Sequence, residues 1–353
     1  MSNQGRDTKS LSASYLWLFG LLFSIFFTTV IWLLGPNLGH FVDTFLPDKG
    51  ASWYYWQLPS RDSLVMVIVW ALYLAHQFSI WAAIYFAYRN LHGFREVSWW
   101  GLPKYSLVAL AINVVFVLLH LLQTQLWFDG LAQDVPIFTS QYSVIIMLAV
   151  VLILENSRRG LFLGWKAGKP FTAQVTAFFR RIHMYVFAWA LVYTFWFHPM
   201  AADPQLISGF LYMFLLFTQM TLAWTPVHLK RKWIVLLESY VAIHAAIVAV
   251  FNTSFFSSPV MWPMFLSGFA FMFVFTYMYA FRVNRAVYWL VTAVYILFLA
   301  WLYLPEPLGY GRSLVNLMRL EFLWIPIILH ALAWLFAGLA YLKLRKWPVK
   351  KAR

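Results

Sequence analysis

The sequence has no cysteine among its 353 residues. Disulfide bonds, thiolate metal sites, iron–sulfur clusters and cysteine nucleophiles are therefore excluded, while the cellular compartment is left open. The GxGxxG fingerprint of dinucleotide-binding domains is also missing, as are the HxxxH and HxxHH clusters of diiron hydroxylases and desaturases. Chemistry in this chain must therefore rest mainly on imidazole, carboxylate and amide side chains, and any electron donor must be a quinone or a redox partner protein.

Charged residues are scarce in this chain. They make up 11% of it, whereas 63% is hydrophobic, with 34 Phe, 20 Trp and 19 Tyr. This is more apolar surface than one water-soluble core can bury, and no Pro/Gly/Ser-rich linker interrupts it. We therefore predict one all-α transmembrane domain over residues 1–353, a polytopic helical bundle with the lipid bilayer as a partner. The net charge of +14 comes from residues beside the apolar segments, which argues against nucleic acid as a partner.

Ten segments of the sequence are apolar and long enough to cross a bilayer as helices, which requires about 20 residues each. No small-residue cleavage site follows the first one, so we expect it to be retained as a span rather than removed as a signal peptide. The predicted spans cover residues 13–34, 63–88, 105–127, 140–156, 182–199, 206–225, 233–252, 261–281, 286–304 and 314–342.

Basic residues are distributed unevenly over the connections between these spans. One alternating set of connections, together with the two termini, holds 22 of the 26 Lys and Arg residues, and the other set holds four. Basic residues near span ends are retained on the cytoplasmic side. We therefore predict a multi-pass plasma (inner) membrane protein whose N-terminus and C-terminus are both cytoplasmic, an arrangement that requires an even number of spans.

Polar residues recur on one face of the predicted span 105–127. Asn113, His120 and Thr124 follow one another at intervals of seven and four residues, and Gln123 adjoins them. Polar side chains inside a membrane are costly and usually face the bundle interior or a watery cavity. The pattern therefore predicts a polar stripe that faces other helices.

A histidine lies at each end of the predicted span 182–199. His183 and His198 are 15 residues apart, which corresponds to about 22 Å along a helix axis and about 60° of rotation. We therefore expect them near the two membrane boundaries, on one side of one helix. His228 and His244 are 16 residues apart, which would rotate them by about 160° in one continuous helix. Pro226 allows His228 to precede the helix instead.

Two pairs of these histidines suggest haem ligation across the membrane. His198 with His244 would form an outer pair, and His183 with His228 an inner pair, so that electrons could pass between two b-type haems. Residues 180–244 thereby resemble the ferric-reductase-like and other b-type cytochrome membrane domains, in which two helices each carry a pair of histidines about fourteen residues apart. The spacings here are slightly longer than that pattern, and the resemblance covers under a fifth of the chain.

A histidine-bound metal centre is a second form of the same hypothesis. His120, His198 and His244 all fall in the outer halves of predicted spans that run outward, so they are the metal-ligand candidates. Our first functional hypothesis is accordingly a haem- or metal-dependent membrane redox protein.

Glu238 and Gln219 are the candidates for catalytic roles. Glu238 lies about a turn and a half inside a predicted span, so it must be paired, protonated or facing water. Lys232, Arg231 and His228 are the expected partners if it is paired. Gln219 is a polar residue within the predicted span 206–225.

Two other functions fit the same residues. A proton-coupled transporter would use His76, His120, Glu238 and His330 as proton sites near the midplane, with Pro326 as a candidate helix break. A membrane-embedded enzyme acting on a lipid or lipid-linked substrate would use histidine as a general base. In that enzyme the basic loop SRRGLFLGWKAGKP would hold a phosphate head group.

Overall fold

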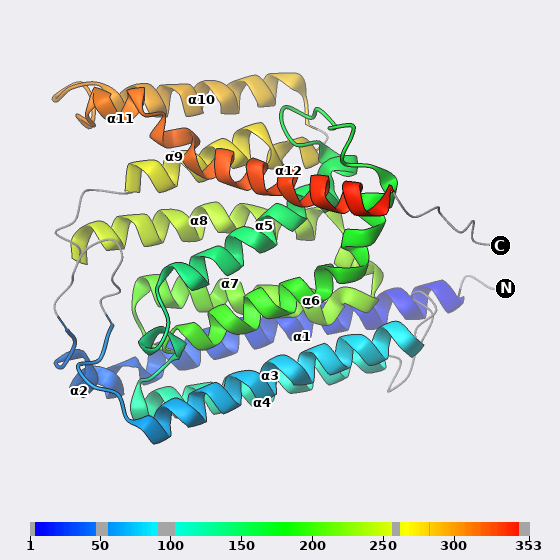
Figure 1. The fold of residues 1–353 in the computed structure, drawn as a ribbon, viewed down its shortest axis with the longest axis vertical. Coiled ribbons are helices and arrows are strands. Elements are labelled where there is room, and N and C mark those ends of the chain that lie inside the picture. The colour runs from blue at the N-terminus through cyan, green and yellow to red at the C-terminus, as the bar shows by residue number, and fades with distance from the viewer. Residues whose placement is uncertain (1–3, 47–55, 91–102, 256–261, 282, 346–353) are drawn as a thin grey trace. The chain divides into compact units, whose positions relative to one another are not determined.

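The structure is a computed structural model that describes residues 4–46, 56–90, 103–255, 262–281 and 283–345. The described residues are mostly helical, and they contain no β-strand (Figure 1). The predicted all-α class is therefore confirmed. The α-helices are α1 (Gln4–Leu34), α2 (Gly39–Val42), α3 (Ser63–Asn90), α4 (Lys104–Trp127), α5 (Phe138–Arg159), α6 (Ala173–Phe197), α7 (Pro204–Thr221), α8 (Arg231–Phe255), α9 (Trp262–Phe275), α10 (Arg285–Tyr303), α11 (Leu314–Met318) and α12 (Trp324–Leu344).

Short 3-10 helices mark several of the connections. They are η1 (Gly35–Leu38), η2 (Leu131–Gln133), η3 (Leu222–Trp224), η4 (Pro226–Leu229), η5 (Tyr277–Ala280) and η6 (Glu321–Leu323).

Nine helices in the described part of the chain are long and apolar enough to cross a membrane. They correspond to nine of the ten predicted spans, so a multi-pass helical membrane protein is supported. The tenth predicted span, 182–199, lies in and just beyond α6, which is helical but is not among the nine. Residues 182–197 of α6 are all buried or half-buried. α6 contains tryptophan and tyrosine, with Arg180, Arg181 and His183 in its first half, which lowers its mean hydropathy below that of the nine helices.

The predicted span 314–342 is not one helix in the structure. α11 ends at Met318, Leu320 has a left-handed backbone (φ 54°), and α12 begins only at Trp324. Pro326 therefore occupies the first turn of α12, where the missing N–H of proline costs nothing. The interruption therefore lies before Pro326 and not at it, and the predicted span 314–342 is corrected to a helix that begins at Trp324.

The chain forms two compact units, which are described separately. Unit 1 comprises residues 1–144, 184–237 and 254–258, and unit 2 comprises residues 145–183, 238–253 and 259–353. α5, α6 and α8 contribute residues to both units. The single domain that the sequence suggests stays a prediction.

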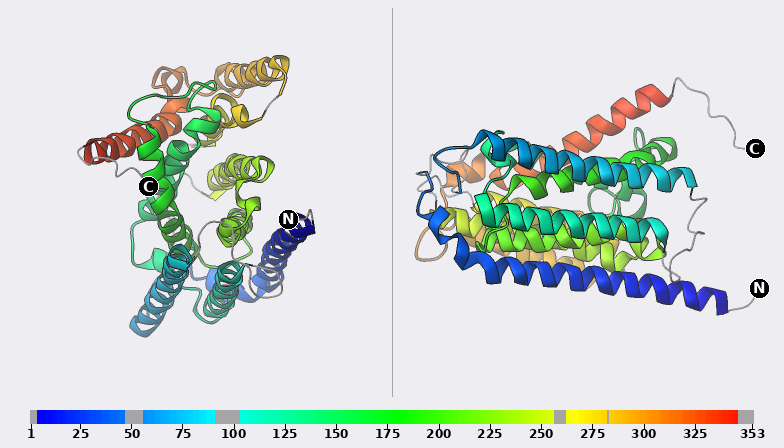
Figure 2. Two further views of the ribbon diagram at one scale, coloured as in Figure 1. Left: turned by 90° about the vertical axis from the view of Figure 1, so that its right-hand side faces the viewer. Right: turned by 90° about the horizontal axis from the view of Figure 1, so that it is seen from below.

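Unit 1 packs its long helices in pairs. α1 lies along α7, and α4 contacts both α3 and α7 (Figure 2). At the α1–α7 contact, the Thr218 hydroxyl donates to the Gly20 carbonyl oxygen at 3.0 Å, so the two backbones lie close together. Close approach at small residues is typical of helix packing in membranes.

Unit 2 is built around α9, which contacts α10, α12 and the short helix η6. Val274, Met278 and Tyr295 form its buried apolar cluster. The Tyr295 hydroxyl donates to the Ser267 carbonyl at 3.2 Å, which ties α10 to α9.

Candidate functional site

The polar stripe predicted on α4 is buried in unit 1. Asn113, His120, Gln123 and Thr124 are each at most 2% exposed. They lie on the side of α4 that also buries Val117, while the opposite side of the helix is exposed. The prediction of an inward-facing polar stripe is thus confirmed.

His76 of α3 lies against this stripe with both ring nitrogens occupied. Its Nε2 is 3.2 Å from the Asn113 Oδ1 atom, and the Trp196 indole N–H donates to its Nδ1 at 3.2 Å. An indole can only donate, so Nδ1 accepts and Nε2 carries the proton. The ring also stacks on Phe116, with 4.5 Å between centroids. These contacts hold His76 as a neutral imidazole in one tautomer.

His120 has a different set of partners. Its Nδ1 is 2.8 Å from Gln123 Oε1, and its Nε2 is 2.9 Å from the carbonyl oxygen of His198. The Gln123 amide nitrogen donates to the Asp129 carbonyl at 2.8 Å, which leaves the amide oxygen facing His120. Both ring nitrogens of His120 therefore face acceptors. A neutral imidazole can donate to only one of them, whereas a doubly protonated ring can donate to both.

Trp196 connects the two histidines. Its indole donates to His76, and its ring packs against the His120 ring with centroids 4.4 Å apart. Trp196 itself is fully buried. Two imidazoles from α3 and α4 thus share one aromatic side chain of α6, and we name His76, Asn113, His120, Gln123 and Trp196 the histidine cluster.

Several buried polar atoms of α3 and α4 have no hydrogen-bond partner within the described residues. They are both amide atoms of Gln77, the amide nitrogen of Asn113 and the hydroxyl of Ser106. These residues are at most 2% exposed. Unpartnered polar groups at such depth are rare, and each indicates strain, a bound water or a ligand. α3 and α4 thus have hydrogen-bonding capacity that the protein does not itself use.

An ionic group lies beyond the C-terminus of α4. Arg61 Nη1 is 2.8 Å from Asp134 Oδ1, and Arg61 Nε is 3.5 Å from Asp129 Oδ2. The Trp70 indole donates to Asp134 at 2.6 Å. Burial raises the pKa of Asp129 to about 6, although Arg61 acts in the opposite direction. Asp129 is therefore a carboxyl group that can exchange a proton near neutral pH.

The end of α4 positions this ionic group beside the histidine cluster. Phe128 adopts a left-handed backbone (φ 57°) that ends the helix, and its N–H bonds the Thr124 carbonyl. Gly130 follows at the C-terminal end of α6, where an added Cβ would lie 2.8 Å from the Phe197 carbonyl oxygen. The absence of a side chain at Gly130 allows the two chain segments to meet, which places the His198 carbonyl within reach of His120.

His198 and His183 have the same local arrangement at opposite ends of the predicted segment. His198 Nδ1 is 2.8 Å from the Thr194 carbonyl, and His183 Nδ1 is 2.7 Å from the Arg180 carbonyl. When Nδ1 donates to a carbonyl, Nε2 is the nitrogen that can bind a metal.

The predicted haem pairs are each divided between the two units. His198 and His228 belong to unit 1, and His183 and His244 belong to unit 2. The pairs therefore stay predictions, as does the metal set of His120, His198 and His244. In the described parts of the chain, no three or more His, Asp and Glu side chains are grouped closely enough to hold a metal ion.

Gln219 and His228 meet in unit 1. His228 lies in η4, before α8 begins at Arg231, as Pro226 suggested. The Gln219 amide donates to the His228 carbonyl at 3.2 Å and accepts from the Trp233 indole at 2.6 Å. Gln219 thus holds η4 against α8, and its predicted catalytic role is untested.

Glu238 is paired, but not with any of the predicted partners. Its carboxylate lies 2.8 Å from Arg159 Nη2, whose side chain is fully buried. The Arg159 guanidinium also lies over the Tyr277 ring, 4.7 Å from its centroid. The correction has a simple cause, because Arg231 and Lys232 start α8 at its solvent end, whereas Arg159 reaches Glu238 from α5. A catalytic role for Glu238 is untested.

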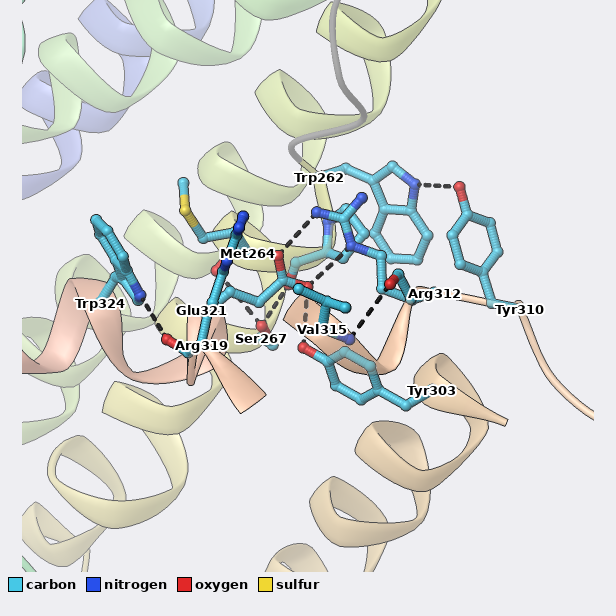
Figure 3. A network of polar contacts seen from close by, with 12 residues as sticks. Trp262, Met264, Ser267, Tyr303, Tyr310, Arg312, Val315, Arg319, Glu321 and Trp324 are labelled. Carbon is cyan, nitrogen blue, oxygen red and sulfur yellow. Dashed lines mark hydrogen bonds and ion pairs between the residues drawn. The ribbon is translucent and has the colours of Figure 1, made fainter. Parts of the chain in front are cut away.

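Unit 2 holds a second polar network, at the break between α11 and α12 (Figure 3). Arg312 binds the Glu321 carboxylate with two hydrogen bonds of 2.9 and 2.8 Å, and the Tyr303 hydroxyl donates to it at 2.9 Å. His330 of α12 faces two carbonyl oxygens, those of Pro326 at 2.8 Å and Leu161 at 3.0 Å. The charges of Arg312 and Glu321 compensate each other, whereas His330, like His120, has an acceptor at each ring nitrogen but is only half-buried.

Sequence reasoning missed several residues of these sites. Arg61, Asp129 and Asp134 fall in connections between apolar segments and show no periodicity. Trp196 is one of 20 tryptophans, so nothing in the sequence distinguishes it. The one usable signal was an acidic pair, Asp129 and Asp134, next to the end of the α4 stripe.

Comparisons with known proteins give no guide to this site. The sequence matches no known protein family, no curated protein resembles it significantly, and no solved structure matches its fold.

Proposed function

We propose that the protein is a proton-coupled membrane transporter and that the histidine cluster of unit 1 is its proton-binding site. The observation that carries this proposal is the environment of His120. Two acceptors, one on each ring nitrogen, match the doubly protonated ring, while complete burial in an apolar bundle opposes its charge. Opposing demands of this kind favour a group that gains and loses a proton as its surroundings change.

The neighbours of His120 support the same proposal. Asp129 directly follows Phe128, the residue that ends α4. Its pKa of about 6 suits it to pass protons between water and the histidine cluster. The unpartnered amide groups of Gln77 and Asn113 provide hydrogen bonds for a polar solute. A proton site beside a polar solute site is what coupled transport requires.

The distribution of basic residues also predicts which side of the membrane the cluster's neighbours face. With both termini cytoplasmic in a plasma membrane, the N-terminus of α3 and the C-terminus of α4 would face outward. Arg61, Asp129 and Asp134 would then lie at the outer face, where protons enter.

Proteoliposomes test this function directly. We expect vesicles containing the protein, with a pH-sensitive dye inside, to acidify faster than empty vesicles when a solute and an inward proton gradient are supplied. Neutral sugars, amino acids, organic acids and amines are supplied in turn. His120→Gln should remove most of the acidification, whereas Arg319→Gln, an exposed residue of unit 2, should retain it. Proton movement that is the same with and without functional protein for every solute class would contradict the proposal.

Haem-dependent electron transfer is the second candidate. The observation in its favour is that Nδ1 of His183 and of His198 each bond a backbone carbonyl, as in histidines that ligate metals. His76 and His120 would have to break hydrogen bonds before they could ligate iron. A visible spectrum of the purified protein, in air and after dithionite, tests this candidate. A Soret band that shifts on reduction and is lost in His198→Ala would favour it over transport.

A further inference from the structure

The loop between α5 and α6 in unit 2 exposes apolar side chains outside any helix. It joins Arg159, the last residue of α5, to Ala173, the first of α6. Phe162, Leu163 and Trp165 are 40%, 48% and 58% exposed. Acyl chains around the bundle account for exposed apolar residues on helices, but these three lie in a connection. They therefore need a partner of their own.

The backbone of this loop is held in one conformation. The Leu161 N–H donates to the Trp165 carbonyl at 2.9 Å, and the Leu163 N–H donates to the Phe275 carbonyl at 2.7 Å. The Thr276 hydroxyl donates to the Leu161 carbonyl at 2.8 Å. The loop is thus fastened to the end of α9, where one side of the Phe162 ring packs against Phe271 and Phe275, while Leu163 and Trp165 stay exposed.

Two further features keep the loop in place. Gly160 and Gly164 have φ values of 80° and 76°, in the left-handed region that glycine adopts without strain. Asn156 bonds Ala167 twice, through its amide nitrogen to the carbonyl at 3.0 Å and through its oxygen to the N–H at 2.9 Å. The two hydrogen bonds between Asn156 and Ala167 thus join the end of α5 to the far side of the loop.

The charge beside the exposed apolar residues is entirely positive. Lys166 and Lys169 are exposed, and residues 160–181 contain four basic residues and no acidic one. A surface that combines aromatic and aliphatic side chains with lysines fits the interface of a bilayer containing anionic lipids. Water or an acidic protein surface could bind the two lysines, but it would leave the apolar side chains of Phe162, Leu163 and Trp165 in a polar environment.

We propose that residues 161–169 form a membrane-surface anchor. Phe162, Leu163 and Trp165 enter the interfacial layer of the bilayer, and Lys166 and Lys169 pair with the phosphate groups of anionic phospholipids. The anchor is independent of the proposed proton transport, because it lies in unit 2 and shares no residue with the histidine cluster.

The lack of cysteine makes this anchor easy to test in the full-length protein. A nitroxide label is attached at Leu163→Cys, at Trp165→Cys or at Gly168→Cys, and each variant is reconstituted in phosphatidylcholine vesicles with or without phosphatidylglycerol. Gly168 is the matched control, because it is exposed in the same loop and no atom lies within 4 Å of an added Cβ. Collision of the label with oxygen and with a water-soluble nickel chelate reports its depth.

We expect labels at 163 and 165 to collide several-fold more with oxygen than with nickel, and the label at 168 to show the reverse. Phosphatidylglycerol should deepen the label at 163, and Lys166→Gln with Lys169→Gln should abolish that lipid dependence. Nickel accessibility at 163 and 165 equal to that at 168 would overturn the anchor. Equal depth in both lipid mixtures would overturn the pairing with anionic head groups. Circular dichroism shows whether each variant is folded. If one of the variants labelled at 163 and 165 does not fold, the other still tests the anchor.

Discussion

The two units differ in the polar groups that they bury most completely. Unit 2 pairs full charges, Arg159 with Glu238 and Arg312 with Glu321. Unit 1 also has an ion pair, of Arg61 with Asp129 and Asp134, but beside it this unit buries neutral imidazoles and amides, and the Gln77 amide has no partner in the described residues. Compensated charges fix a structure but have little capacity left to bind anything else. Uncompensated neutral groups cost stability and are retained where function needs them.

The largest effect should come from breaking the fully buried charge pair of unit 2. Glu238→Ala leaves the Arg159 guanidinium without its carboxylate, and we expect a loss of about 3–5 kcal/mol in the free energy of unfolding. The double variant Arg159→Met with Glu238→Met should recover most of that loss, because it removes both charges together. Unfolding by denaturant in detergent, followed by circular dichroism, gives both values. A single variant as stable as the native protein would show that the pair contributes nothing.

A smaller loss is expected at the second pair, which water can reach. Arg312→Gln removes both charged hydrogen bonds to Glu321, and we expect a loss of about 1.5–3 kcal/mol in the free energy of unfolding. Arg319→Gln is the control, since its side chain is exposed and has no ion pair in the described residues. The same unfolding measurement compares the two. Equal effects at 312 and 319 would contradict the structural role of the network in Figure 3.

Unit 1 should respond with the opposite sign. Gln77→Leu removes two unpartnered polar atoms from a buried position, so we expect the free energy of unfolding to rise by about 1–3 kcal/mol. If transport uses this amide, proton-coupled uptake should fall in the same variant. Gln123→Leu is the matched control, because Gln123 is bonded at both ends and its loss should destabilise the protein. If Gln77→Leu were less stable than the native protein, the Gln77 amide would not be a destabilising group, and the proposed difference between the two units would be wrong.

The smallest effect concerns pH. The Asp129 carboxyl binds its proton more tightly in the folded protein, with a pKa of about 6, than in the unfolded chain at 3.8. Its contribution to stability is therefore fully present below pH 4 and is lost as the pH rises through 6. Asp129→Asn should abolish this decline, which we expect to amount to about 1–2 kcal/mol because the Arg61 pair is partly solvated. Unfolding midpoints of both proteins at pH 4 and pH 7.5 measure the difference.

Much of the architecture could be predicted from local patterns. Apolar length predicts the spans, because every backbone group in a bilayer must be bonded within its own helix. Spacing predicts the buried stripe of Asn113, His120 and Thr124, because residues seven and four apart share a helical face. The interruption at Leu320 escaped prediction, because the left-handed residue there is neither glycine nor asparagine and the local sequence gives no turn signal.

The candidate site was harder to predict, because its contacts join distant positions. Glu238 and Arg159 are 79 residues apart, and Trp196 lies 120 residues from His76. A helical pattern shows which face a residue occupies, but it does not show which helix covers that face. For the same reason, spacing alone cannot show whether His198 faces His244 or His183 faces His228, so both pairs stay predictions.

Trp196 has one more consequence. Its rigid indole touches both imidazoles at once, so a shift of the His76 ring cannot leave His120 undisturbed. The two rings are thus joined through one packed side chain, with no direct hydrogen bond between them in the described part of the chain, so substitution of Trp196 would alter the surroundings of both imidazoles together.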